Sequence, residues 1–261
     1  MFTVADRDRV RDRVLALAAA DTRVVAGAVV GSLALGEGDR WSDLDLTFAV
    51  VDGVRVLDVL SEWTRTLAAE FDAVTLFDLS AGASLYRVFL LPGCLQFDLS
   101  FTPAAAFGAT GPTFRLLFGS AVEKPYTPAA DPGEVFGYAV HHAVRARFCI
   151  ARGRLWQAEY WISGVRDAAL TLACMRRDLP ASHGRGYDAL PAETRDALAG
   201  ALVRSLDAAE LLRALGVAIA GLRREADQVR ELAGRVEPRL RELTGAWEPD
   251  ADASPAGEAR E

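Results

Sequence analysis

Two hydrophobic patterns follow one another along this chain, and the change between them predicts two parts of different fold. Up to about residue 103, short runs of branched and aromatic residues alternate with polar turns, which is typical of strands. Apolar residues at helical spacing predict helices over residues 4–20 and 56–71, and Ser32 is expected to cap a short helix over 33–36. Five strands are expected, at residues 24–30, 44–51, 74–79, 85–91 and 95–101.

From residue 134 onward the pattern is helical. Alanine- and leucine-rich segments predict four helices, and Pro238 is expected to bend or break the last of them. These helices are expected at residues 134–152, 155–177, 191–206 and 208–243. Residues 103–132, rich in Pro, Gly and Thr, connect the two parts. The sequence therefore predicts an α+β chain, with a mixed-sheet domain at 1–125, an all-α helical bundle at 134–247 and a disordered tail at 248–261.

Composition and charge narrow the kind of partner. The chain has 261 residues, 51% of them hydrophobic, and a formal net charge of −7. Proteins that track nucleic-acid phosphates gain affinity from clustered Lys and Arg, so the negative charge argues against a nucleic-acid partner and favours a small molecule. No apolar run reaches the roughly 18 to 20 residues of a membrane span, and the first residues are charged where a signal peptide is apolar. We therefore expect a cytoplasmic protein with no membrane partner.

The stretch from Gly31 to Asp45 holds the residues with the clearest chemistry. Asp43 and Asp45 stand at i and i+2 at the start of the 44–51 strand, so both side chains are expected on one face of the sheet. Two carboxylates held together repel each other unless a cation lies between them, and all-oxygen ligands suit Mg²⁺. Asp98 lies in a later strand among apolar residues. If that strand pairs beside 44–51, three carboxylates converge, as two-metal phosphoryl or nucleotidyl transfer requires.

Gly31 and Ser32 complete the pattern, because a turn at a helix N-terminus offers backbone N–H groups and a hydroxyl to phosphates. Gly31-Ser32, ten residues and then Asp43-Leu44-Asp45 resembles the signature of the DNA polymerase beta-like nucleotidyltransferase superfamily. In that superfamily a third acid follows on a later strand. The helical second part and the chain length make the protein similar to the antibiotic nucleotidyltransferases, which adenylylate aminoglycosides or lincosamides.

The resemblance implies roles for the acids and for the reaction. Asp43 and Asp45 would hold two Mg²⁺ ions, and Asp98 would be the third metal ligand and the general base for the acceptor hydroxyl. The implied reaction transfers a nucleoside monophosphate, expected to be AMP with ATP as the donor, to a hydroxyl of a small molecule and releases pyrophosphate. An aminoglycoside- or lincosamide-like antibiotic is one candidate acceptor.

The resemblance also implies residues for nucleotide binding. Gly31 and Ser32 would bind the triphosphate of ATP. Many members carry a basic residue close to the serine, where this chain has Leu35. Arg40 lies further along, and we assign it to nucleotide binding together with Ser42.

A polar line on the second predicted helix of the second part is a candidate acceptor wall. Its residues follow one another at steps of three, four and three, and apolar positions flank them. They are Trp156, Glu159, Ser163 and Arg166. Glu159 would bind the acceptor or share the role of catalytic base with Asp98, and Arg166 would reach a phosphate. A solvated helix face explains the same spacing equally well.

Other interpretations stay open. Asp43 and Asp45 taken alone are compatible with a turn residue and a solvated strand end. A nucleotide-binding regulatory or antitoxin module would keep the acids without turnover, and a protein-AMPylating enzyme would use a Tyr, Ser or Thr hydroxyl as acceptor. Sites of this class are in some cases shared across a homodimer. The Asp-x-Asp-x-Thr pattern of haloacid-dehalogenase-like phosphatases is excluded, because there the apolar strand precedes the acids and here it follows them.

Overall fold

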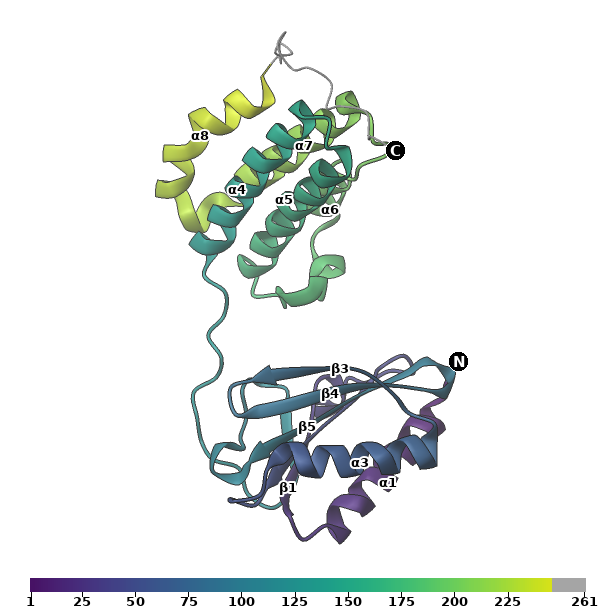
Figure 1. The fold of residues 1–261 in the computed structure, drawn as a ribbon. Helices are drawn as coiled ribbons and strands as arrows, with labels where there is room; N and C mark the ends of the chain where they lie inside the picture. The colour runs from purple at the N-terminus through teal and green to yellow at the C-terminus, as the bar shows by residue number, and fades with distance from the viewer. Residues whose placement is uncertain (246–261) are drawn as a thin grey trace. The chain divides into compact units, whose positions relative to one another are not determined.

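The computed structural model describes residues 1–245, which form an α+β fold in two compact units (Figure 1). The division falls between Pro128 and Ala129, within the predicted connecting segment. We call the part before it unit 1 and the part after it unit 2. The tail predicted at 248–261 lies outside the described residues.

Unit 1 contains a six-stranded sheet whose order is β3-β4-β5-β2-β1-β6. β2 and β5 pair in parallel, and all other neighbours are antiparallel. The strands are β1 (Val24–Val30), β2 (Leu44–Val50), β3 (Val74–Ala81), β4 (Ser84–Leu91), β5 (Leu95–Pro103) and β6 (Phe114–Phe118). The predicted hairpin around Pro92 and Gly93 is present as β4 and β5.

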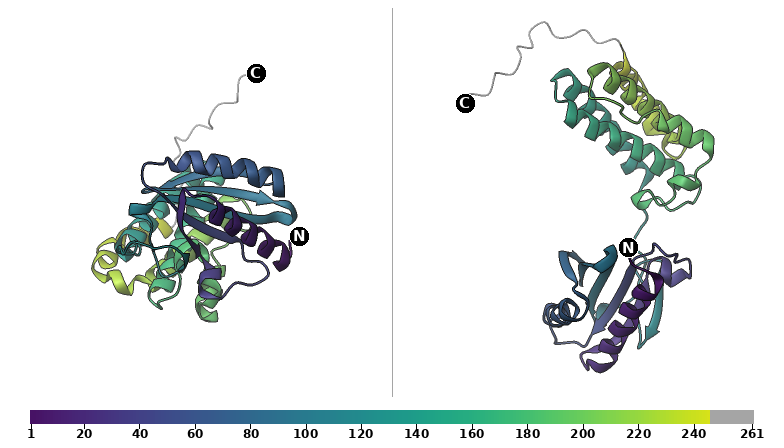
Figure 2. Two further views of the ribbon diagram at one scale, coloured as in Figure 1. Left: turned by 90° about the horizontal axis from the view of Figure 1, so that it is seen from below. Right: turned by 90° about the vertical axis from the view of Figure 1, so that its right-hand side faces the viewer.

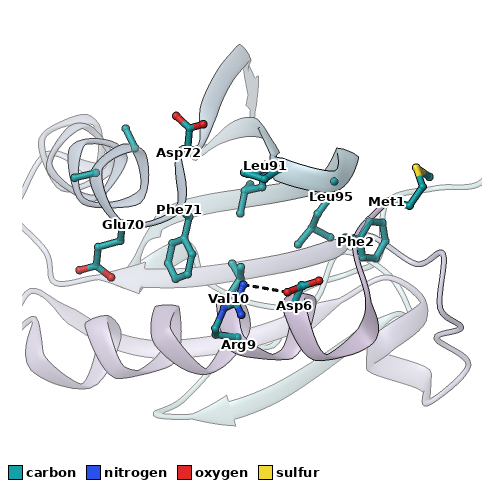
Figure 3. A pocket seen from close by; sticks show the side chains of 14 residues that line it. Met1, Phe2, Asp6, Arg9, Val10, Glu70, Phe71, Asp72, Leu91 and Leu95 are labelled. Atoms are coloured by element: carbon teal, nitrogen blue, oxygen red, sulfur yellow. Dashed lines mark hydrogen bonds and ion pairs between the residues drawn. The ribbon is translucent and has the colours of Figure 1, made fainter.

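Two helices, α1 (Val4–Ala20) and α3 (Val56–Phe71), cover one face of this sheet (Figure 2). α1 begins with a capping box, in which the Thr3 hydroxyl accepts from the Asp6 N–H and the Asp6 carboxylate accepts from the Thr3 N–H. A cavity of about 820 Å³ opens among the first residues of α1, the last turn of α3 and the β4–β5 turn (Figure 3). Phe71, Leu91 and Leu95 are among the residues that line it.

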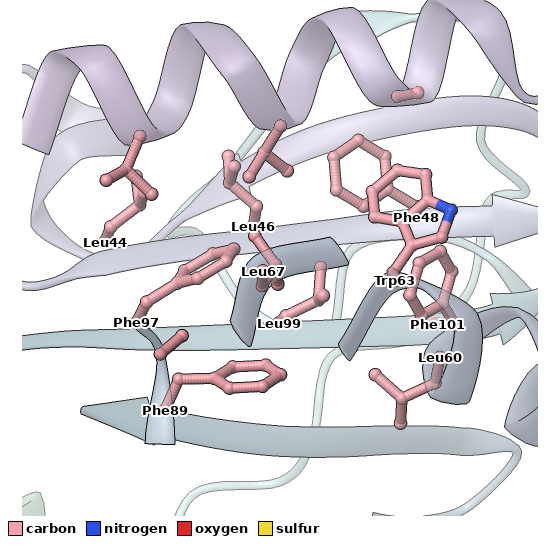
Figure 4. Packing of buried hydrophobic residues seen from close by; sticks show 14 of the residues in the cluster. Leu44, Leu46, Phe48, Leu60, Trp63, Leu67, Phe89, Phe97, Leu99 and Phe101 are labelled. Atoms are coloured by element: carbon pink, nitrogen blue, oxygen red, sulfur yellow. The ribbon is translucent and has the colours of Figure 1, made fainter. Parts of the chain in front are cut away.

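The core of unit 1 lies between these helices and the sheet (Figure 4). Leu44, Leu46 and Phe48 alternate along β2 and are all buried, because every second residue of a strand points to the same face. Trp63 of α3 packs on Phe48 and meets the Phe101 ring edge-on, with centroids 5.0 Å apart. The intervening residues of β2, including Asp45 and Thr47, therefore point to the opposite face of the sheet.

β6 corrects the sequence analysis, which predicted only a connection over 103–132. Four of the five residues of β6 have register partners on the free edge of β1, with Val30 opposite Phe114. This run is short and flanked by Pro, Gly and Thr residues, so it has too little periodicity to indicate a strand by itself. The strand is stabilised by backbone hydrogen bonds to β1, which the local sequence pattern does not reveal.

Unit 2 is a helical bundle in which alanines allow close helix contacts. Ala139, Ala143 and Ala146 of α4 are fully buried in a core shared with α5 and α7. The helices are α4 (Pro132–Ala151), α5 (Leu155–Met175), α6 (Ala192–Ala199), α7 (Ala208–Arg224) and α8 (Arg230–Thr244). None of the helices within residues 1–245 is long and apolar enough to span a bilayer.

Two predicted helices of unit 2 end earlier than expected. The helix predicted over 191–206 stops at Ala199, where Arg213 donates to the carbonyls of Gly200 and Leu202 and satisfies the backbone after the helix. The helix predicted over 208–243 is interrupted after Arg224 rather than at Pro238, which lies inside α8.

A buried glutamate accounts for the place of the second interruption. Glu225 is 5% exposed and accepts hydrogen bonds from the guanidinium groups of Arg176 and Arg177 at 2.7–3.3 Å. These bonds hold Glu225 against the end of α5, so α7 ends there.

Candidate functional site

Asp45 and Asp98 lie side by side at the centre of the sheet in unit 1. β5 is the direct neighbour of β2, and Asp45 and Asp98 are register partners in the parallel ladder. Since Leu44 and Leu46 point into the core under α1 and α3, Asp45 and Asp98 project from the opposite face, which we call the acid face. The two carboxylates therefore extend from neighbouring strands toward the same side.

Buried hydroxyls lie on the acid face directly after the two acids. The next residues on this face, Thr47 and Ser100, are also register partners, and the Ser100 hydroxyl donates to Thr47 Oγ1 at 2.8 Å. Further along, the hydroxyls of Ser84 and Thr102 are 2.7 Å apart. The hydroxyls in these pairs satisfy one another. The charged residues of this polar row, Asp45 and Asp98, therefore lie at one end of it.

The environment of Asp98 disfavours its charged form. Partial burial raises the pKa of Asp98, and the negative charge of Asp43 raises it further. A hydrogen bond of 3.1 Å from Gln96 Nε2 acts in the opposite direction. The charge of Asp43 thus acts on Asp98, and Asp43 directly precedes β2, as the predicted strand over 44–51 implies.

The chemistry of the acids suits a hard cation, but the side chains do not form a finished cage. Within residues 1–245, no three His, Cys, Asp or Glu side chains are arranged so that they could hold a metal ion by themselves. Mg²⁺ in proteins usually takes one or two carboxylates and completes its shell with water and substrate phosphates. Asp45 and Asp98 fit that smaller requirement, and the assignment of Asp43, Asp45 and Asp98 as metal ligands stays a prediction.

Gly31 packs against the carboxylate of Asp45 at the end of β1. Its φ of 71° and ψ of −154° belong to a region that is essentially restricted to glycine. A Cβ on Gly31 would lie 2.5 Å from Asp45 Oδ2, so only glycine allows this approach. The glycine of the predicted motif therefore has a structural reason beside the acid.

Ser32 does not cap a helix, contrary to the sequence analysis. It is the first residue of α2 (Ser32–Leu35), Gly31 takes the N-cap position, and no side chain caps this helix. The Ser32 hydroxyl instead donates to Ser42 Oγ at 3.3 Å. The two predicted nucleotide-binding serines are thus brought together, next to the strand that carries Asp45.

The turn before Asp43 is organised by Asp39. Its carboxylate accepts from the backbone N–H of Trp41 at 2.7 Å and from the Ser42 hydroxyl at 3.1 Å, while Ser42 Oγ accepts from the Asp39 N–H. These hydrogen bonds, led by the one from Trp41, lower the pKa of Asp39. Arg40 is exposed, with its guanidinium 3.8 Å from the centroid of the Trp41 ring.

Two arginines beside this site were not predicted from the sequence. Arg7 of α1 is buried and donates to the carbonyls of Asp39 and Ser42. Arg115 of β6 donates to the carbonyl of Leu33 in α2 at 3.3 Å. Arg7 precedes Val10 by three positions on the buried stripe of α1, a spacing that could have identified it, whereas Arg115 depends on a strand that was not predicted.

The predicted acceptor wall lies on α5 in unit 2. The Ser163 hydroxyl donates to Glu159 Oε1 at 2.7 Å, and Trp156 is 77% exposed. The guanidinium of Arg166 is held by the carboxylate of its neighbour Asp167 at 2.8–2.9 Å. The spacing that defined the stripe is present, and the roles of Glu159 and Arg166 toward an acceptor stay predictions. None of the predicted site residues lines the cavity shown in Figure 3.

Comparisons with known proteins give distant likenesses to solved structures and none to family models or curated sequences. No protein-family model matches the sequence, and no curated protein sequence matches it. Among solved structures, the chain is similar to an aminoglycoside 6-adenyltransferase from Bacillus subtilis, with a TM-score of 0.40 and 13% sequence identity. The similarity covers 90% of this chain and 97% of that chain. A likeness of this size does not define a family or a function for this chain.

Proposed function

We propose that this protein is a magnesium-dependent nucleotidyltransferase that transfers AMP from ATP to a hydroxyl of a small molecule. The observation that carries the proposal is the register of β2 and β5, which places Asp45 directly opposite Asp98. The packing of Gly31 on Asp45 and the influence of Asp43 on Asp98 add a glycine-serine turn and a third acid. Paired carboxylates beside such a turn suit the handling of a nucleoside triphosphate.

The residues around the acids have distinct roles in this reaction. Asp43 and Asp45 would orient the triphosphate through Mg²⁺, which when bound neutralises phosphate charge. The hydroxyls of Ser32 and Ser42, with Arg40 from the same turn, would contact phosphate oxygens.

Asp98 would accept the proton of the acceptor hydroxyl. The acceptor oxygen then forms a bond to the α-phosphorus of ATP, the bond to the bridging oxygen breaks, and pyrophosphate leaves. A carboxylate with a raised pKa is the stronger base, which suits Asp98 to this task. Positioning of the two substrates supplies most of the expected rate acceleration.

Release of pyrophosphate tests the proposal directly. The full chain is incubated with ATP, Mg²⁺ and a panel of hydroxylated metabolites, aminoglycosides and lincosamides, and pyrophosphate is measured with a coupled assay. We expect release with at least one acceptor and an AMP adduct of that acceptor in mass spectrometry. Binding of Mg²⁺-ATP without release for any acceptor, or AMP attached to a protein side chain instead, would contradict the proposed reaction.

Asp45→Asn identifies the site, with Asp52→Asn as the matched control. Asp52 is exposed and lies just beyond the other end of β2, so its replacement changes the net charge equally. Asp45→Asn is expected to remove nearly all turnover with an unchanged circular dichroism spectrum, whereas Asp52→Asn keeps the wild-type rate. Full activity of Asp45→Asn refutes the assignment of the acid face.

A further inference from the structure

Arg7 connects α1 to the turn that precedes the acids. Its side chain is 5% exposed and lies on the buried stripe of α1 together with Val10 and Val14. Nη1 donates to the carbonyl of Asp39 at 2.7 Å and to the carbonyl of Ser42 at 2.9 Å, across 32 and 35 positions of sequence. A single guanidinium nitrogen thus holds both ends of the Asp39–Ser42 turn.

Packing alone does not explain an arginine at this position. A buried guanidinium loses its hydration, and an apolar side chain of similar size would fill the same space without that cost. Within the described part of the chain, the buried Nε of Arg7 has no hydrogen-bond partner. Arg7 donates to both carbonyls, whereas an apolar residue would leave the Asp39 carbonyl with only the 3.4 Å bond from the Ser42 N–H and the Ser42 carbonyl without its bond to Arg7.

The bond to Ser42 has a direct consequence for Asp43. The carbonyl of Ser42 belongs to the planar peptide group that joins Ser42 to Asp43. A hydrogen bond that holds this carbonyl therefore also holds the backbone nitrogen of Asp43. The same turn holds Ser42 Oγ, which receives the hydrogen bond from Ser32. Displacement of this turn therefore changes the positions of Asp43 and Ser42 together and disturbs the hydrogen bond from Ser32.

We propose that Arg7 is a positioning residue of the acid face: it holds the Asp39–Ser42 turn so that Asp43 and Ser42 stand ready for Mg²⁺ and the triphosphate. Arg7 acts from behind the turn through two backbone carbonyls and does not itself touch the substrate. The part of this inference that concerns Mg²⁺ rests on the proposed function, whereas the part that concerns the turn does not.

Arg7→Met and Arg7→Lys test the inference, with Arg9→Met as the matched control. Methionine keeps much of the volume of Arg7 without a donor, and lysine keeps the charge and one donor group. Arg9 stands on the same helix, is exposed and pairs only with Asp6 among the residues described, so Arg9→Met removes the same charge elsewhere. Hydrogen exchange of the amides of residues 39–43 reports on the turn, and the Mg²⁺ dependence of pyrophosphate release reports on the site.

In Arg7→Met we expect amide exchange in the turn to accelerate by about tenfold or more, with no change in β4 or α3, since the loss is local. The Mg²⁺ concentration for half-maximal rate should rise by about 10- to 100-fold, as for other groups that orient metal ligands. Arg7→Lys should recover part of both effects, and Arg9→Met should show neither.

Two results would overturn the inference. One is turn exchange and a Mg²⁺ requirement in Arg7→Met that equal those of Arg9→Met. The other is acceleration of exchange throughout unit 1 in both Arg7 variants, which would mean that Arg7 serves general stability. If the wild-type protein releases no pyrophosphate, the proposed function fails, and the exchange data alone then decide whether Arg7 holds the turn.

Discussion

In the proposed reaction, Asp98 combines a cost in stability with a benefit in chemistry. Its carboxylate is partly buried beside Asp45 and feels the charge of Asp43, so its pKa is raised above that of an ordinary aspartate. A base with a raised pKa takes up a proton more readily, but its charged form is held in a place that disfavours charge. This trade of stability for function is common at active sites.

Asp98→Asn separates the two effects. Turnover should fall by about 10²- to 10⁴-fold, the usual contribution of a general base. Asparagine resembles the protonated side chain, so in metal-free buffer at pH 7 the variant should unfold at a higher urea concentration than the wild type. Pyrophosphate release and urea unfolding monitored by circular dichroism measure the two quantities.

The sign of the stability change follows from linkage. A folded pKa above the unfolded value gives stability that is fully present below the unfolded value and is lost as pH rises through the folded value. The gain from Asp98→Asn should therefore shrink as pH falls and be absent below about pH 3, where both states of Asp98 are protonated. A variant that is less stable than the wild type at pH 7 would show that the ionised carboxylate has a stabilising partner.

Single residues could be singled out from the sequence where their residue type is unusual at that position. Asp43 and Asp45 stand out because two acids at i and i+2 repel each other unless a cation lies between them, and Asp98 because it lies among apolar strand residues. Their metal-binding and catalytic roles stay predictions. Arg7 was missed because an arginine on a helix is normally exposed, and only the fold shows that this one reaches the Asp39–Ser42 turn.

At the scale of elements, the turn from β1 into α2 is constrained by the conformation of Gly31 and by its contact with Asp45. Gly31→Ala places a Cβ against Asp45 Oδ2, and Gly36, with a φ of 74°, provides the matched control at the other end of α2. A Cβ at Gly36 meets nothing within 4 Å, so Gly36→Ala introduces only backbone strain.

Both glycine variants should lose about 1–3 kcal/mol of unfolding free energy, since each forces alanine into a conformation with positive φ. Only Gly31→Ala should also lose turnover, because the added methyl group displaces the carboxylate of Asp45. Urea unfolding measures the stability of the two variants, and pyrophosphate release measures their turnover. Equal turnover in Gly31→Ala and Gly36→Ala would show that Asp45 tolerates displacement.

Elements followed from the sequence where periodicity and boundaries agree. β1 to β5, α1 and α3 lie within a few residues of their predicted bounds, because alternation and helical spacing are both clear in unit 1. The interruption between α7 and α8 was not predicted, since the apolar stripe continues through it. It depends on Arg176 and Arg177, which lie 49 and 48 positions before Glu225, so no local pattern reveals it.

At the scale of the whole molecule, the order of the strands decides the site, and strand order is a long-range property. The sequence predicted β2 and β5 but left their pairing conditional. β5 reaches β2 because β4 and β5 form a hairpin and β2 then takes the free edge of β5. That arrangement brings Asp45 and Asp98 together across 53 positions of sequence.

Each unit has a hydrophobic core of its own, which predicts that each folds alone. The buried clusters of the two units share no residue, and the residues that carry the proposed nucleotide chemistry, from Gly31 to Asp98, all lie in unit 1. Residues 1–128 and 129–245, expressed separately, should each unfold cooperatively in urea. The first should bind Mg²⁺-ATP in isothermal titration calorimetry, and the second should not.

The measurement of Mg²⁺-ATP binding by residues 1–128 also tests the predicted role of Arg166 in nucleotide binding. If the full chain binds Mg²⁺-ATP and residues 1–128 fold but do not bind it, unit 2 must contribute to nucleotide binding, and Arg166 is its predicted residue. Arg166 is already paired with Asp167, so recruiting it to a phosphate would require breaking that ion pair. We therefore expect the 1–128 protein to retain the affinity of the full chain to within about tenfold, a difference of about 1.4 kcal/mol. A larger loss would assign part of the nucleotide site to the helical bundle.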